Sequence, residues 1–127
     1  MATLVDSYTV LPTSDATSLY NASTYDSVGQ SFDSGAGGDI STAKCYCHTN
    51  GSPTGSVYAK LYAHSGTFGT SSVGTGAALA ISDAVDITTI GSVDEWVEFT
   101  FTSTYEMTAS TKYVIMFYYQ GGDSSNK

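Results

Sequence analysis

The chain has 127 residues and a formal net charge of −8, with twelve Asp and Glu against four Lys and no Arg. A nucleic-acid-binding surface needs basic side chains that replace the counterions of the phosphate backbone, so this balance excludes nucleic acid and disfavours anionic membranes as partners. Charged residues make up only 13% of the chain, and Tyr, Thr, Ser and Gly take their place. Such a composition is typical of a β-rich, turn-dense protein.

Several segments of the chain show the sequence pattern of β-strands. An alternation of apolar and polar residues with a period of two marks a strand that is buried on one face. Residues 112–120 are instead apolar on both faces, which indicates a central strand that is covered on both sides. In chain order, the expected strands are 3–11, 27–33, 40–48, 55–66, 84–90, 95–103 and 112–120.

Turn-forming residues separate these segments. The stretch "NGSPTG" (50–55) predicts a hairpin between its two flanking strands, because Asn-Gly, Pro and Gly favour tight turns. Residues 34–39 and 64–79 are Gly-rich and predict loops, and only residues 74–84 have the composition of a short helical turn. Short strands at this spacing predict an all-β fold, an antiparallel β-sandwich of the jelly-roll or Greek-key type.

The expected domain spans residues 1–127, with an N-terminal strand and loop in residues 1–26. The expected central strand, 112–120, is followed by only one loop before the sequence ends. A sandwich would normally send the chain back as one more strand. We therefore expect a strand after residue 126 that is either missing or supplied by another molecule, as in donor-strand association. A plain boundary in a disordered tail is the alternative.

Two cysteines and a histidine stand together in "CYCH", residues 45–48. Cys45 and Cys47 at positions i and i+2 of a strand would lie about 6.6–6.8 Å apart at Cα, the upper limit for a disulfide, with parallel side chains. A zinc site needs four ligands, and the two histidines, His48 and His64, fall on the opposite face of the expected hairpin. We therefore expect both cysteines to pack in the core as small apolar residues.

The outward face of the same expected hairpin carries Tyr46, Tyr58 and Tyr62 together with His48 and His64. Exposed aromatic rings can stack on the apolar C–H face of a sugar, and two neighbouring histidines could bind a transition metal. The same face would also serve for packing on a second sheet or on a neighbouring protein. We expect this face to bind the ligand or form the interface.

The sequence offers candidate ligands for one metal ion, calcium, and contains no recognisable enzymatic motif. Calcium takes six to eight oxygen ligands without strict geometry, and several aspartates lie in or beside loops rich in Gly, Ser and Asn. A phosphate-binding loop, a Gly-x-Ser-x-Gly elbow and a His-Glu-x-x-His motif are all absent, so we expect no enzyme and no cofactor other than calcium. The calcium candidates are Asp33, Asp39, Asp83, Asp86 and Asp123.

Four stretches carry a family resemblance: "VGQSF" (28–32), residues 49–86, "WVEFTF" (96–101) and residues 108–126. Together they resemble a jelly-roll module that recurs in phage virion and tail-associated proteins and in bacterial surface proteins of the choice-of-anchor kind. The similarity covers nearly all of residues 28–126. Its most specific parts are the "SPTG" to "GTSS" block and the "KYVI" to "SSN" block.

The resemblance implies a non-enzymatic structural or decoration module of a phage particle or another extracellular assembly. Its partners would be copies of itself or other virion or surface proteins. The chain departs from the family at Cys45 and Cys47, where members often hold larger apolar residues, and after residue 126, where members continue into another strand. The alternative function is a carbohydrate-binding module that uses the tyrosines named above to bind a glycan.

Overall fold

The structure is a computed structural model in which residues 4–5, 18–19 and 26–127 are described. Most of the expected N-terminal strand, 3–11, lies outside the described residues. The elements are β1 (Ser27–Asp33), β2 (Gly38–Asp39), β3 (Thr42–Cys47), β4 (Gly55–Ser65), β5 (Val73–Ile81), β6 (Val85–Asp86), the 3₁₀ turn η1 (Ile87–Thr89), β7 (Glu95–Thr100), β8 (Glu106–Met107) and β9 (Lys112–Gly121).

Within the described residues every strand pair is antiparallel and no α-helix forms, which confirms the expected all-β class. The largest sheet has the order β1-β9-β4-β5, and the short strand β6 also pairs with β4. β9 therefore has a neighbour on each side, so residues 112–120 form a central strand as predicted. The expected cover on both faces is only partial, because the outward residues Met116 and Tyr118 are half-buried. Two separate two-stranded ladders, β2–β8 and β3–β7, complete the pairing of the described residues.

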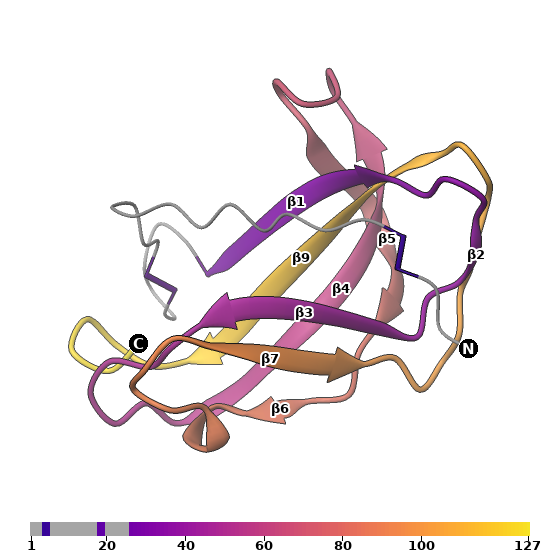
Figure 1. Ribbon diagram of the computed structural model, residues 1–127. Coiled ribbons are helices and arrows are strands. Elements are labelled where there is room, and N and C mark those ends of the chain that lie inside the picture. Colours follow the sequence, from indigo (N-terminus) through magenta and orange to yellow (C-terminus); the bar gives the residue numbers. More distant parts are fainter. Residues whose placement is uncertain (1–3, 6–17, 20–25) are drawn as a thin grey trace.

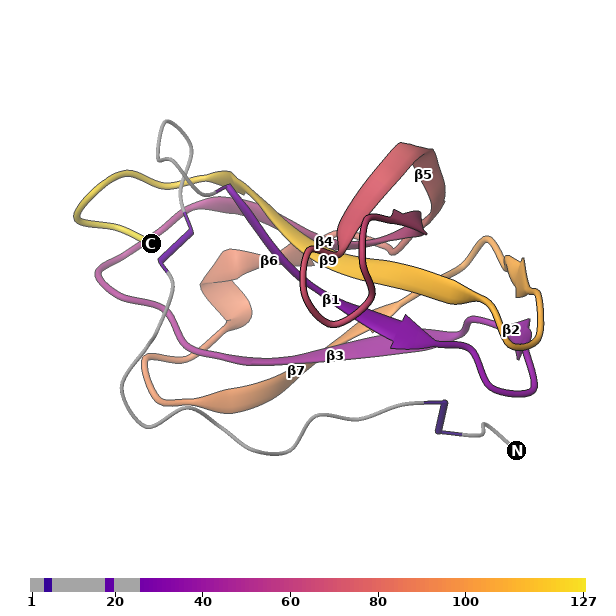
Figure 2. The same cartoon turned by 90° about the horizontal axis from the view of Figure 1, so that it is seen from above.

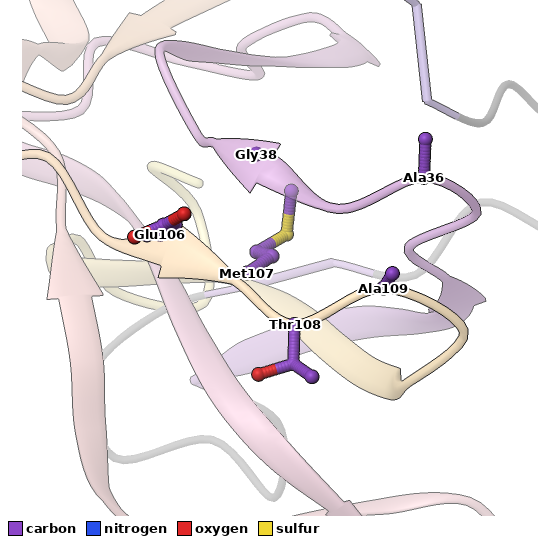
Figure 3. Close-up of a pocket in the computed structure, with 6 residues that line it drawn as sticks. All are labelled: Ala36, Gly38, Glu106, Met107, Thr108 and Ala109. Atoms are coloured by element: carbon purple, nitrogen blue, oxygen red, sulfur yellow. The ribbon is translucent and has the colours of Figure 1, made fainter.

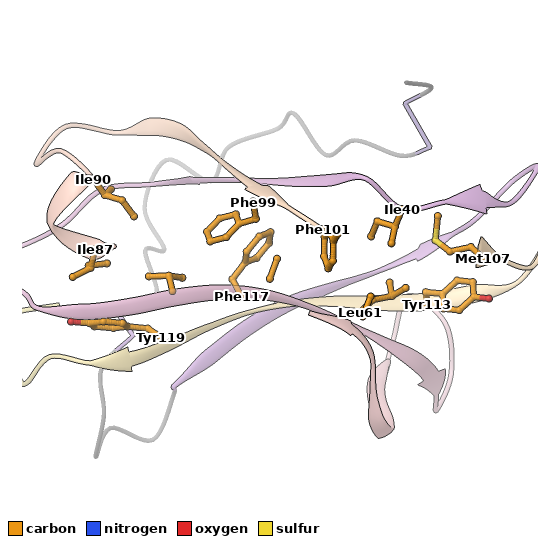
Figure 4. Close-up of a cluster of buried hydrophobic side chains, with 13 residues drawn as sticks. Ile40, Leu61, Ile87, Ile90, Phe99, Phe101, Met107, Tyr113, Phe117 and Tyr119 are labelled. Atoms are coloured by element: carbon orange, nitrogen blue, oxygen red, sulfur yellow. The ribbon is translucent and has the colours of Figure 1, made fainter. Parts of the chain in front are cut away.

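The β3–β7 ladder lies across one face of the larger sheet, and the main core fills the space between them. Figures 1 and 2 show the two strands in a layer of their own, opposite β1, β9 and β4. In Figure 4, Phe99 and Phe101 project into the core from one side, and Leu61 and Phe117 project from the other. Phe99 and Leu61 are both 0% exposed.

The predicted alternation of buried and exposed residues is confirmed in three strands. In β4, Val57, Ala59 and Leu61 are buried, whereas the residues between them are only partly buried. Phe99 of β7 and Phe101 just after it are buried as well. In β3, the cysteines share the inward face and pack against the core, as expected, although both are half-buried.

The predicted hairpin between β3 and β4 is wrong. β3 pairs with β7 and β4 pairs with β9, so the two strands that flank residues 50–55 belong to different layers. The turn residues are present but serve another purpose. Asn50 exchanges two backbone hydrogen bonds with Lys127, at 2.6 and 2.9 Å, so the loop that crosses between the layers is fixed to the C-terminal segment.

Strand β5 occupies residues that were predicted as a Gly-rich loop or a short helical turn, and both predictions are wrong there. β5 pairs with β4 through Lys60↔Ile81 and His64↔Gly74, with an irregularity between Leu61 and Ala63. The expected strand 84–90 reduces to β6 followed by η1, because the Asp86 carboxylate accepts the Thr88 N–H and starts the 3₁₀ turn.

Candidate functional site

Beyond the exposed Thr42–Thr100 pair, the outer face of the β3–β7 ladder carries three side-chain pairs in a row. At the centre, Tyr46 lies opposite Trp96, with ring centroids 5.3 Å apart and an angle of 57° between the ring planes. Two residues along the strands on either side, the outward positions carry polar pairs. We call this surface the Trp96 face and define it as Lys44, Tyr46, His48, Asp94, Trp96 and Glu98.

In each polar pair of the Trp96 face, the two side chains contact one another. Lys44 Nζ lies 3.2 Å from Glu98 Oε2, and His48 Nδ1 lies 2.7 Å from Asp94 Oδ1. The side chains of all four residues remain between 41% and 56% exposed. Trp96 itself is 51% exposed. The face is thus an accessible aromatic pair between two polar pairs, each of which carries both a donor and an acceptor.

Tyr58 and Tyr62 lie on the other layer, so the expected surface of three tyrosines and two histidines is not a single face. Their register partners are Tyr118 and Val114 of β9, on the outer face of the larger sheet. Tyr46 belongs to β3, and β3 does not pair with β4. The reason is the strand pairing: the prediction assumed a β3–β4 hairpin that the chain does not form.

The outer face of the larger sheet gathers its own aromatic side chains. Lys60 Nζ lies 4.1 Å from the centroid of the Tyr118 ring, a distance at which a cation–π attraction is effective. Val114 is only 4% exposed, although it belongs to this face and not to the main core cluster. We call this second surface the tyrosine face; it consists of Tyr58, Lys60, Tyr62, Val114, Met116 and Tyr118.

The two histidines do not approach one another, so the structure does not support a metal site formed by this pair. His48 is bonded to Asp94 on the Trp96 face, and His64 Nε2 lies 2.9 Å from Ser72 Oγ. A serine and a histidine at that distance could form a nucleophile and base. However, Ser72 Oγ also accepts the Gly69 N–H at 3.2 Å, so the serine closes the β4–β5 loop. Among the described residues, no carboxylate contacts His64 to complete a triad.

Three of the calcium candidates accept hydrogen bonds within their own loops. Asp33 accepts the Gly35 N–H at 2.9 Å and contacts Lys112 at 3.4 Å, and both interactions lower the pKa of its carboxyl group. The pKa of Asp86 is lowered by hydrogen bonds from Thr88. The pKa of Asp123 is lowered by hydrogen bonds from the C-terminal turn, chiefly from Asn126. Each carboxylate is thus held ionised by donors of the chain itself.

The other two candidates also lie apart. Asp83 accepts the Thr102 hydroxyl at 2.5 Å, and Asp39 lies opposite Glu106 in the β2–β8 ladder. Across the described residues, no three His, Cys, Asp or Glu side chains come together as they would around a metal ion. The structure therefore does not gather the five aspartates into one calcium site.

A shallow pocket of about 450 Å³ lies beside the β2–β8 ladder (Figure 3). Its walls are mostly backbone and small side chains, and its one ionisable group is the exposed carboxylate of Glu106. The side chain of Met107 is buried and belongs to the core cluster. The pocket offers too few convergent polar groups to orient a ligand. It is lined by Ala36, Gly38, Glu106, Met107, Thr108 and Ala109.

The cysteines of β3 affect one another. The pKa of Cys45 is raised by its side-chain hydrogen bond with Cys47 and by burial, whereas the same hydrogen bond lowers the pKa of Cys47. The stabilised thiolate is therefore that of Cys47. Both thiols point toward the core, so this difference in pKa affects the reactivity of the cysteines and does not create a ligand site.

Trp96, Asp94 and Glu98 were not among the predicted site residues, although one signal in the sequence pointed to them. The alternation in 95–103 puts Val97 and Phe99 inward, and the same period puts Trp96 and Glu98 outward. Tryptophan is enriched at binding surfaces, so an outward tryptophan is a candidate contact residue. The sequence did not indicate that Tyr46 would lie opposite it.

Comparison of the chain with protein-family models, with curated proteins and with solved structures finds no match. Within the part of the chain that the structure describes, no helix has the length and apolarity needed to cross a membrane.

Proposed function

We propose that this chain is a non-enzymatic structural module, a jelly-roll-like β-sandwich that decorates a phage particle or another extracellular assembly by packing against copies of itself. The fold part of the proposal is supported by the β3–β7 ladder, which covers one face of the larger sheet with a common core between them. The resemblance of residues 28–126 to virion and surface modules supports the location.

The tyrosine face is the surface through which we propose that two copies pack. Its aromatic side chains lie on the neighbouring strands β4 and β9, and Gly74 of β5 packs closely against Tyr62 and Met116. Lys60 is its one charged member, and its ammonium group already lies over Tyr118. A face with a single charge loses little solvation when it is covered, and aromatic residues and Met are enriched in protein interfaces. This face therefore suits tight packing against a second copy.

Light scattering on the 127-residue chain over a range of concentrations tests the proposal. We expect a mass above that of a monomer, and we expect Tyr58→Lys to return it to the monomer mass because the new charge must be desolvated at the contact. Thr100→Lys is the matched control, since it adds the same charge to the exposed end of β7 on the other layer. A wild-type chain that stays monomeric, or a Tyr58→Lys variant that still associates, contradicts the proposal. A loss of mass in EDTA would add calcium to the contact.

A further inference from the structure

The shape of the Trp96 face suits a single sugar ring better than a flat partner surface. Its two aromatic rings are inclined by 57°, so no flat surface can cover both at once. A single ring stacked on the indole would instead touch the Tyr46 ring with its edge. Covering a half-exposed indole is favourable, by about 25 cal/mol for each Å² of apolar surface removed from water.

The polar pairs stand where the rim of such a ring would be. Each lies two residues along the chain from the aromatic pair, about 7 Å in an extended strand: Lys44–Glu98 within the ladder and His48–Asp94 at its end. Each pair provides both a donor and an acceptor: Lys44 with Glu98, and His48 with Asp94. A sugar hydroxyl both donates and accepts, so it can bond to either member.

The charges of the face disfavour other occupants. Lys44 and His48 are each engaged by a carboxylate, so an acidic glycan would find no free cation here. A protein partner that sealed the face would have to bury an ion pair and the Asp94 carboxylate, which is costly. A sugar ring leaves these groups at a hydrated rim.

We propose that the Trp96 face binds a neutral hexopyranose polysaccharide, with one ring stacked on Trp96 and its hydroxyls bonded to the flanking pairs. The site goes beyond the proposed self-association, because it lies on the layer opposite the tyrosine face. A copy that packs through its tyrosine face leaves its Trp96 face exposed.

Trp96 is the only tryptophan of the chain, so its fluorescence reports on this site alone. The probes are hydroxyethylcellulose and a galactomannan, with alginate as the acidic comparison. We expect the two neutral polymers to change the emission in a saturable manner and alginate to leave it unchanged. Retardation of the chain in native gels that contain each polymer gives a second readout that also works for variants without tryptophan.

The variants separate this proposal from the previous one. We expect Trp96→Ala to weaken retardation by the neutral polymers at least tenfold, Trp96→Phe to restore part of it, and Glu98→Ala to weaken it severalfold. Tyr58→Lys, on the opposite layer, should bind the polymers as the wild type does, whatever its solution mass. Glu98 is exposed, so its variant keeps the test valid if Trp96→Ala does not fold.

Three results would overturn the site. The first is an emission that responds to neither neutral polymer. The second is polymer binding that survives Trp96→Ala but is lost in Tyr58→Lys. The third is a fall in the solution mass of Trp96→Ala with no polymer response in the wild type, which would assign the face to protein packing.

Discussion

The ring of Phe99 in β7 lies with its centroid 5.1 Å from that of Phe117 in β9, and the two planes are inclined by 51°. This contact joins the two layers of the molecule, as Figure 4 shows. Within the described residues no β-ladder connects β3–β7 to the larger sheet. Side-chain packing, together with the hydrogen bond from the Asp83 N–H to the Thr100 carbonyl at 2.8 Å, therefore positions the β3–β7 ladder and the Trp96 face on its outer side.

Removal of the Phe99 ring should destabilise the whole molecule. Phe99 is fully buried, and truncation of such a ring costs about 3–5 kcal/mol through lost burial and the cavity that remains. We expect Phe99→Ala to lower the free energy of unfolding by that amount in a urea titration. Phe68→Ala is the matched control, because Phe68 is 42% exposed in the β4–β5 loop and should cost about 1 kcal/mol or less. Equal losses in the two variants would show that the interlayer contact is not the main support.

The sequence predicted which face of each clear strand is buried, because the alternation is local and has a period of two. It therefore identified Val57, Leu61 and Phe99 as inward residues, and the structure confirms them. It did not predict correctly which strands pair, since the hairpin expected between β3 and β4 does not form. The choice of β7 as partner of β3 depends on contacts between residues about fifty positions apart, for example Tyr46 with Trp96. The Trp96 face could be found only after that pairing was known.

Strand β5 was missed for a different reason. Its sequence, VGTGAALAI, consists largely of small residues with low strand propensity, and Gly76 has a positive φ of 74°. What makes it a strand is its pairing with β4, and Gly74 fits there because a Cβ at that position would lie within 3.0 Å of Tyr62 Cβ. Stabilisation by pairing with a neighbouring strand cannot be predicted from the strand propensities of the residues alone.

The two cysteines should differ in reactivity. The hydrogen bond from Cys45 lowers the pKa of Cys47 and raises that of Cys45, so at neutral pH a larger fraction of Cys47 than of Cys45 is thiolate. The thiolate is the form that is alkylated. We expect limiting iodoacetamide to label Cys47 before Cys45, as located by fragment-ion mass spectrometry of the peptide that holds both. Cys45→Ala should slow the labelling of Cys47, whereas Cys45→Ser keeps a hydroxyl donor and should slow it less. Faster labelling of Cys45 would reverse the assignment.

Tyr119 links the end of β9 to the loop before β4, and this link should weaken in alkali. Its side chain is buried, and its hydroxyl donates to the Thr54 carbonyl at 2.9 Å. Burial, with the nearby Asp123 carboxylate, raises the pKa of Tyr119 above its usual value of 10.0. Because the unfolded chain ionises first, the stabilisation is complete below pH 10 and is lost as the pH rises through the higher pKa of the folded state.

A Tyr119→Phe variant tests this pH dependence. At pH 7 the variant lacks the hydrogen bond and should be about 0.5–1.5 kcal/mol less stable than the wild type in urea. Phenylalanine does not ionise, so the variant should lose less stability between pH 10 and pH 11, and the two unfolding free energies should converge. The measurement is a set of urea titrations from pH 7 to pH 11. A gap that stays constant over this range would mean that the Tyr119 phenol does not contribute to alkaline unfolding.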